Sequence, residues 1–185
     1  MKLCNLIVAA LIIFVGVNYA GAQTPKIEYV GKIIDQPDSP VKIISYKCSY
    51  GMHSKVALVG EKTQGIRHQT EYQNTSERGI LAVGLDYVMF NLFDEFLEWA
   101  PTIETDFLKP SEKDKSDGVV DAALYTPGQL SSFLTGIVFV SRVRFADGEI
   151  WRANLDTVIA NLTKIDKEFP ASALKHKTLS HDQQK

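Results

Sequence analysis

The chain has 185 residues, of which 45% are hydrophobic and 23% are charged, and its formal net charge at pH 7 is −2. This length is sufficient for one domain with a buried core. The slightly negative charge and the lack of a Lys/Arg cluster argue against nucleic acid as a partner, because phosphate binding requires concentrated positive charge on one face.

Residues 1–22 are expected to be a cleaved signal peptide. Lys2 gives a positive start, residues 6–17 form an apolar run, and Ala20 and Ala22 are small residues at the positions that signal peptidase recognises. The alternative is a retained anchor, but the apolar run is shorter than the roughly 20 residues of a spanning helix. We therefore expect a secreted or periplasmic chain that starts at Gln23 and has no stable membrane span.

Cys48 is the one cysteine that remains after cleavage, since Cys4 leaves with the signal peptide. No intramolecular disulfide can then form, and stability must come from packing. We expect Cys48 to be a small buried hydrophobe on a strand, and a reactive thiol is the alternative.

Residues 27–91 show the period-two alternation of β-strands. The expected strands cover residues 27–34, 41–50, 55–59, 66–73 and 79–91, with turn residues between them. The last strand should turn one face to the core, namely Leu81, Val83, Leu85, Tyr87 and Met89. The sequons at Asn74 and Asn161 are interpreted as turn and helix residues rather than as glycosylation sites.

The two segments that follow are expected to leave the β pattern. Leu92, Phe93, Phe96, Leu97 and Trp99 are spaced for one face of a short helix that Pro101 ends, and an extended continuation of the strand is the alternative. Residues 109–118 are rich in charge and in Pro and Ser, which predicts an exposed loop.

A hairpin and a helix are expected near the end of the chain. Residues 133–145 form a strand with Ile137, Phe139, Val143 and Phe145 on one face, and Asp147-Gly148 predicts a two-residue type I′ turn into a partner strand at 149–153 that carries Trp151. Apolar residues from Leu155 to Ile165 then follow helical spacing, with Asn154 as N-cap. Residues 170–185 are expected to be a flexible polar tail.

These elements predict a mainly β fold. Short strands, regular turns and one terminal helix favour an antiparallel, immunoglobulin-like β-sandwich of about seven strands over residues 23–169, with a C-terminal amphipathic helix.

The turn Asn74-Thr75-Ser76 and the strand end Tyr87-Val88-Met89-Phe90-Asn91 resemble the FxLYD family and related secreted bacterial immunoglobulin-like domains. In that family an Asn-x-Ser turn leads into a strand ending Phe-x-Leu-Tyr-Asp, and each specified position of the closing motif is replaced here by a similar residue. The resemblance implies a sandwich used for extracytoplasmic adhesion or interaction, and it carries over no catalytic residue.

The sequence contains no motif that demands catalysis. Cys48, Met52 and His53 could act as soft copper ligands, but a strand leading into a turn accounts for them equally, and we expect neither a metal nor a cofactor. We therefore expect a non-catalytic binding module that contacts another protein or an envelope component through Phe93, Phe96 and Trp99. The alternative is a small secreted hydrolase that uses the carboxylates of the acidic segment 94–106.

Overall fold

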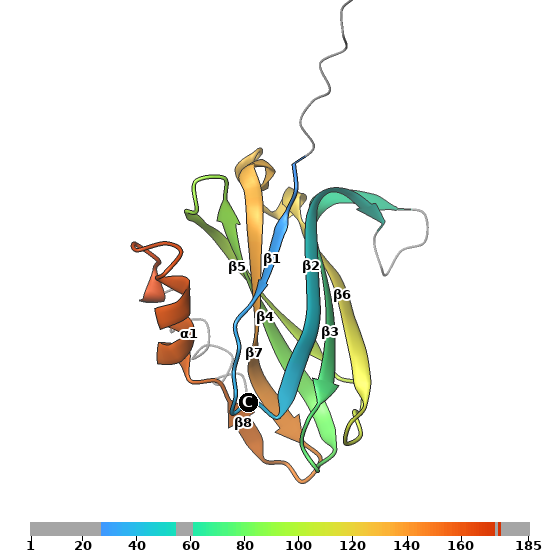
Figure 1. Ribbon diagram of the computed structural model, residues 1–185. Helices are drawn as coiled ribbons and strands as arrows, with labels where there is room; N and C mark the ends of the chain where they lie inside the picture. Colours follow the sequence, from blue (N-terminus) through green and yellow to red (C-terminus); the bar gives the residue numbers. More distant parts are fainter. Residues whose placement is uncertain (1–26, 55–60, 173, 175–185) are drawn as a thin grey trace, which may run out of the picture.

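The computed structural model describes residues 27–54, 61–172 and 174, and Figure 1 shows the arrangement of their secondary structure. The predicted signal peptide at 1–22 and the predicted strand at 55–59 lie outside these residues. The elements are β1 (Val30–Ile33), β2 (Val41–Ser54), β3 (Lys62–Asn74), β4 (Ile80–Asn91), β5 (Phe96–Glu104), β6 (Lys113–Asp121), the 3-10 helices η1 (Ala122–Leu124) and η2 (Gln129–Ser132), β7 (Phe133–Phe145), β8 (Ile150–Arg152) and α1 (Leu155–Leu162).

The strands form two sheets that pack face to face. One sheet has the order β1-β7-β4-β5, with β8 also paired to β7, and the other has the order β2-β3-β6. In Figure 1, α1 lies on the outer side of the first sheet. The mainly β class, the sandwich and the helix near the C-terminus are thereby confirmed. The sheets are not wholly antiparallel, because β1 pairs with β7 in parallel, and the immunoglobulin-like assignment stays a prediction.

The central strands β4 and β7 are buried on both faces. Their inner side chains, including Leu85 and Val140, pack with Val41 and Tyr72 of the second sheet. Their outer side chains pack beneath α1; this group comprises Val88, Phe90, Ile137 and Phe139, covered by Val158 and Leu162. The stripe predicted for the helix is thus buried as expected, and Asn154 Oδ1 accepts the N-cap hydrogen bonds from Asp156 N and Thr157 N.

β-Bulges change which residues of these strands face the core. One register shift between β4 and β7 passes from Leu85↔Val140 to Gly84↔Arg142, so Ser141 is skipped. Val143 and Phe145 therefore join Val138 and Val140 on the inner face, and their predicted grouping with Ile137 and Phe139 is wrong. A second shift next to Ile80 leaves Leu81 exposed, although it was predicted to face the core.

The helix predicted around residues 92–99 is also wrong, and the alternative of a continuing strand is correct only in that residues 96–99 are extended, because β4 ends at Asn91 and a turn precedes the antiparallel strand β5. Asn91 Oδ1 accepts hydrogen bonds from Phe93 N and Glu95 N and closes a turn in which Asp94 has a φ of 60°. β5 then runs from Phe96 through Pro101. β5 is the edge strand of its sheet, a position at which proline costs no ladder hydrogen bond.

The loop predicted at residues 109–118 is a strand over most of its length. β6 pairs with β3 from Gln73↔Lys113 to Gly65↔Asp121. The charged side chains that led to the loop prediction lie largely on the solvent side of β6, where Asp117 pairs with Arg67. Ser116 points into the interior. An edge strand of this kind tolerates charge because only one of its faces is buried.

The β7–β8 turn and the start of the C-terminal tail differ from the prediction. Gly148 N donates to Phe145 O over 3.0 Å, Phe145 N donates to Glu149 O, and Gly148 has a φ of 93°. This is a three-residue loop with glycine in the left-handed position, not the predicted type I′ turn. Leu174 is buried in the cluster beneath α1, so packing extends past the predicted tail boundary at Pro170.

Candidate functional site

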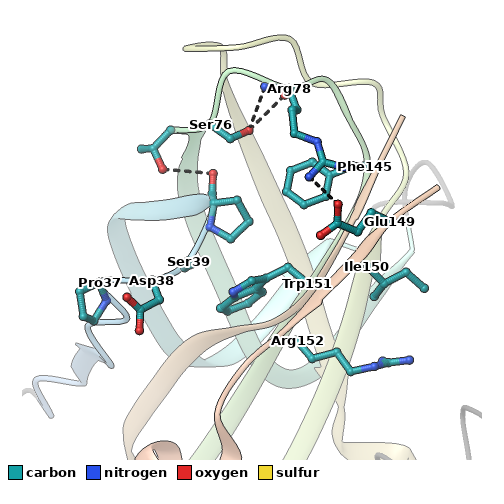
Figure 2. A pocket seen from close by; sticks show the side chains of 12 residues that line it. Pro37, Asp38, Ser39, Ser76, Arg78, Phe145, Glu149, Ile150, Trp151 and Arg152 are labelled. Atoms are coloured by element: carbon teal, nitrogen blue, oxygen red, sulfur yellow. Dashed lines mark hydrogen bonds and ion pairs between the residues drawn. The ribbon is translucent and has the colours of Figure 1, made fainter. Parts of the chain in front are cut away.

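One end of the sandwich carries two adjoining hollows, which we call the Trp151 groove. The larger has a volume of about 640 Å³ and is lined by residues 37–40, by residues of the β3–β4 turn and by the β7–β8 hairpin (Figure 2). The smaller has a volume of about 340 Å³ and reaches the first turn of α1 at Asn154 and Thr157. Four residues line both hollows, namely Pro37, Asp38, Trp151 and Arg152.

Trp151 occupies the wall common to both hollows because β8 is fixed against β7. The two strands pair at Val143↔Trp151, and Ala153 N donates to Ser141 O just beyond them. One part of the indole packs against the inner core cluster, while the side chain as a whole is only half-buried. Figure 2 shows the ring near the centre of the lining residues. The ring is therefore held by the core and is also available at the surface.

The loop that faces Trp151 is held by specific hydrogen bonds. The Gln36 side chain donates to Val140 O over 2.9 Å and accepts from Val140 N over 2.8 Å. Thr75 donates to Pro40 O from both its amide and its hydroxyl, and Ser39 Oγ donates to Val41 O. A groove whose walls are fixed in advance loses little conformational entropy when it is occupied.

Charge at the rim of the groove is balanced. The Arg78 guanidinium lies 3.7 Å from the centroid of the Phe145 ring, donates to Glu149 over 2.8 Å and also pairs with Asp147. The hydrogen bond from Arg78 holds the pKa of Asp147 below its usual range. Because Arg78 already has acidic partners, this rim does not form a trap for phosphate or another polyanion.

The structure does not bring Phe93, Phe96 and Trp99 together as a surface. Phe93 is 80% exposed in the turn after β4, whereas Trp99 is 5% exposed in the cluster beneath α1. Phe96 is half-buried, with its ring 5.3 Å from that of Phe169 and 6.4 Å from that of Phe90. The turn that holds Phe93 lies at the other end of the sandwich from the β7–β8 hairpin (Figure 1).

Glu95 and Glu104 of the acidic segment 94–106 take part in structural contacts. Glu95 accepts a hydrogen bond from Asn91 Nδ2 over 2.7 Å. Glu104 accepts one from Ser116 Oγ over 2.6 Å, which links β5 to β6 across the sandwich. Asp94 occupies the turn between β4 and β5. These contacts give no support to the hydrolytic alternative.

The three residues considered as copper ligands, Cys48, Met52 and His53, do not converge on one site of β2. Cys48 and His53 are five residues apart on one strand and so point to opposite faces. His53 Nε2 lies 3.2 Å from Ser49 O, and Met52 is exposed. Cys48 lies on a strand as predicted and is half-buried; burial raises the pKa of its thiol, which lies 3.5 Å from Val30 O.

Sequence reasoning placed Trp151 on its strand but did not find the groove. Its walls come from segments more than 100 residues apart, joined by contacts such as that between Gln36 and Val140. The local signal was a tryptophan beside a hairpin turn, which is equally typical of a core position.

Comparison with known proteins gives no assignment of family or function. No family model matches the chain, and no curated protein matches it. A hypothetical protein of Peptoclostridium difficile 630 is similar over 70% of this chain and 92% of its own, with 9% sequence identity and a TM-score of 0.47. Target SoR45 of the Northeast Structural Genomics Consortium is similar over 62% of this chain and 80% of its own, with 14% identity and a TM-score of 0.36.

Neither likeness carries an argument about fold or function at these scores. In the part of the chain that the structure describes, no helix is long and apolar enough to cross a membrane.

Proposed function

We propose that this protein is a non-catalytic, extracytoplasmic binding module that contacts an extended segment of a partner protein through the Trp151 groove. The observation that carries the proposal is the half-buried Trp151 ring on the common wall of two hollows with fixed walls. Tryptophan and arginine are enriched among the residues that dominate protein interfaces, and binding residues commonly lie on the loop end of a rigid scaffold.

The chemistry of the groove supports a polypeptide as the occupant. Pro37, Pro40 and Trp151 offer apolar surface, while Asp38 and Arg152 add charges of opposite sign. A strongly acidic or basic ligand would gain little from this balance. An extended peptide that places an apolar side chain against the indole and polar groups along the rim matches it on both counts.

The extracytoplasmic location rests on the predicted signal peptide at 1–22, and the resemblance of residues 74–91 to FxLYD domains is consistent with a binding role. The extracytoplasmic location and the binding role are therefore both included in the proposal.

The proposal is tested by capture of a partner protein. Residues 23–185 are immobilised, exposed to an extracytoplasmic extract of the source cells, and compared with Trp151→Ala and Phe93→Ala variants. We expect a protein retained by the wild type and by Phe93→Ala, with at least tenfold less retained by Trp151→Ala.

Because Trp151 also packs against the core, Asp38→Lys provides a second test at an exposed groove position. Thermal unfolding of each variant separates a loss of binding from a loss of folding. Equal retention by the wild type, Trp151→Ala and Asp38→Lys would refute the proposal, and loss by Phe93→Ala alone would move the contact surface to the opposite end of the sandwich.

A further inference from the structure

A buried histidine in the interior lacks a hydrogen-bond partner on one side of its ring. His68 is 2% exposed and lies between the rings of Tyr46 and Tyr87, with centroid distances of 5.9 and 4.5 Å. Its Nδ1 is 2.6 Å from Tyr46 Oη, but its Nε2 has no partner within the described part of the chain. Buried polar atoms are nearly always hydrogen-bonded, so this atom calls for an explanation.

Burial keeps both the His68 ring and the Tyr46 phenol uncharged. Burial lowers the pKa of His68 to about 3, so the ring is neutral at physiological pH and carries one N–H. Burial also raises the pKa of Tyr46 well above its usual value, so the phenol keeps its proton. When the ring carries its proton on Nε2, the phenol donates to Nδ1, and Nε2 is an N–H donor without an acceptor in the described part of the chain.

His68 lies between the Tyr46 side chain and the edge strand β6. β3 lies between β2 and β6, and Nδ1 is engaged by Tyr46 of β2. On the other side of β3, the backbone partner of His68 is Gly118 of β6.

A cavity of about 450 Å³ lies beside His68, between the edge strands β5 and β6 of the two sheets. Tyr87, Ala100 and Thr102 line it from one sheet, and Gly118 and Val120 line it from the other. Gly118 lies on the same face of β6 as the inward residues Ser116 and Val120, yet a Cβ placed on it would meet no atom within 4 Å. The cavity thus occupies the space that a larger side chain at this position would fill.

The lining restricts the chemistry of an occupant. The lining residues include no lysine or arginine, and Asp121 is the one residue among them that is charged at neutral pH. An anion would therefore be disfavoured. Tyr87 and Tyr125 offer aromatic surface, and the volume falls in the range of small-molecule sites.

We propose that His68 carries its proton on Nε2 and that this cleft binds a small neutral molecule with a flat apolar body and one carbonyl-type oxygen that accepts a hydrogen bond from His68 Nε2. Because His68 is itself buried, the ligand reaches it when side chains lining the cleft move apart slightly. The cleft is distinct from the Trp151 groove, so this inference does not depend on the proposed function.

Acetophenone serves as the probe, and ethylbenzene serves as a probe of similar shape without an acceptor. Each is titrated to about 5 mM, a range suited to ligands of this size, into protein labelled with ¹⁵N-histidine. We expect acetophenone to move the His68 Nε2–H resonance downfield in a saturable manner and to bind about fivefold more tightly than ethylbenzene.

Gly118→Leu should abolish the shift by filling the cavity, whereas Gly51→Leu should retain it, because position 51 also offers open space but lies on β2 away from the cleft. If Gly118→Leu does not fold, His68→Phe provides the second variant and should bind the two probes equally. An Nε2–H resonance that no probe displaces, or a shift unchanged in Gly118→Leu, would overturn the proposal; exchange of this proton with water alone would show a hydrated cleft and would also overturn it.

Discussion

Two buried titratable groups give the folded protein opposing responses to acid. Burial lowers the pKa of His68 from 6.5 to about 3 and raises that of Asp86 from 3.8 to about 6, in spite of hydrogen bonds to Asp86 from Ser141 and Trp99. As the pH falls below 6.5, the unfolded chain binds a proton at His68 but the folded protein does not, so the free energy of unfolding decreases. As the pH falls through 6, the folded protein binds a proton at Asp86 before the unfolded chain does, so stability is regained.

The two effects largely cancel in the wild type. Between pH 8 and pH 4.5, the His68 shift costs about 3 kcal/mol of unfolding free energy, and the Asp86 shift returns about 2 kcal/mol. The pair should therefore cost the wild type only about 1 kcal/mol over this range. Asp86→Asn removes the compensating proton and should expose the full loss of about 3 kcal/mol from His68.

Urea unfolding followed by tryptophan fluorescence at pH 8 and pH 4.5 measures this difference. Carboxylates with a lowered pKa, such as Asp117 and Asp147, are present in both proteins and cancel in the comparison. His68→Asn should respond in the opposite sense and become more stable in acid relative to the wild type. Parallel pH profiles for the wild type and Asp86→Asn would refute the account of compensating protons.

Three further predictions concern stability and can be checked by urea unfolding at neutral pH. Gly136→Ala places a Cβ 2.3 Å from Tyr46 Oη and should lower the free energy of unfolding by about 1–3 kcal/mol. Gly51→Ala, whose Cβ meets nothing within 4 Å, should stay within about 0.5 kcal/mol of the wild type or gain stability. Equal effects of the two substitutions would show that Tyr46 can move freely. Asn74→Ala removes a fully buried amide that donates to two backbone carbonyls and should cost about 1–3 kcal/mol; an unchanged midpoint would contradict its role in the turn. Asn154→Ala should cost about 1 kcal/mol through loss of the helix cap, and Asn154→Asp should restore most of that loss.

Elements with strong local signals were predictable from the sequence. The strand predicted at 133–145 has those bounds in the structure, because its apolar run is long and ends at a glycine turn. The helix begins after Asn154 as predicted, since a cap residue followed by helical spacing leaves few alternatives.

The two segments that were predicted wrongly are the edge strands β5 and β6. Residues 92–99 satisfy helical spacing, but the backbone groups of β5 find partners on β4, which an isolated sequence pattern does not contain. The charged run at 109–118 lacks the apolar content of a strand, yet Ser116 and Asp114 of β6 accept hydrogen bonds from the hydroxyls of Tyr87 and Tyr72. In both cases a neighbouring strand outweighs local propensity, as is common at sheet edges.

The difference between Trp99 and Trp151 follows from the faces of the sheet on which they lie. Each tryptophan lies on a strand of the same sheet, and local spacing does not separate the two. Trp99 pairs with Val88 and packs in the cluster beneath α1 on the outer face. Trp151 pairs with Val143 and packs against the inner cluster, which α1 does not cover, at the end where Gln36 and the loop after it line the groove. Strand pairing and the docking position of the helix, which are tertiary properties, therefore decide which aromatic residue remains available for binding.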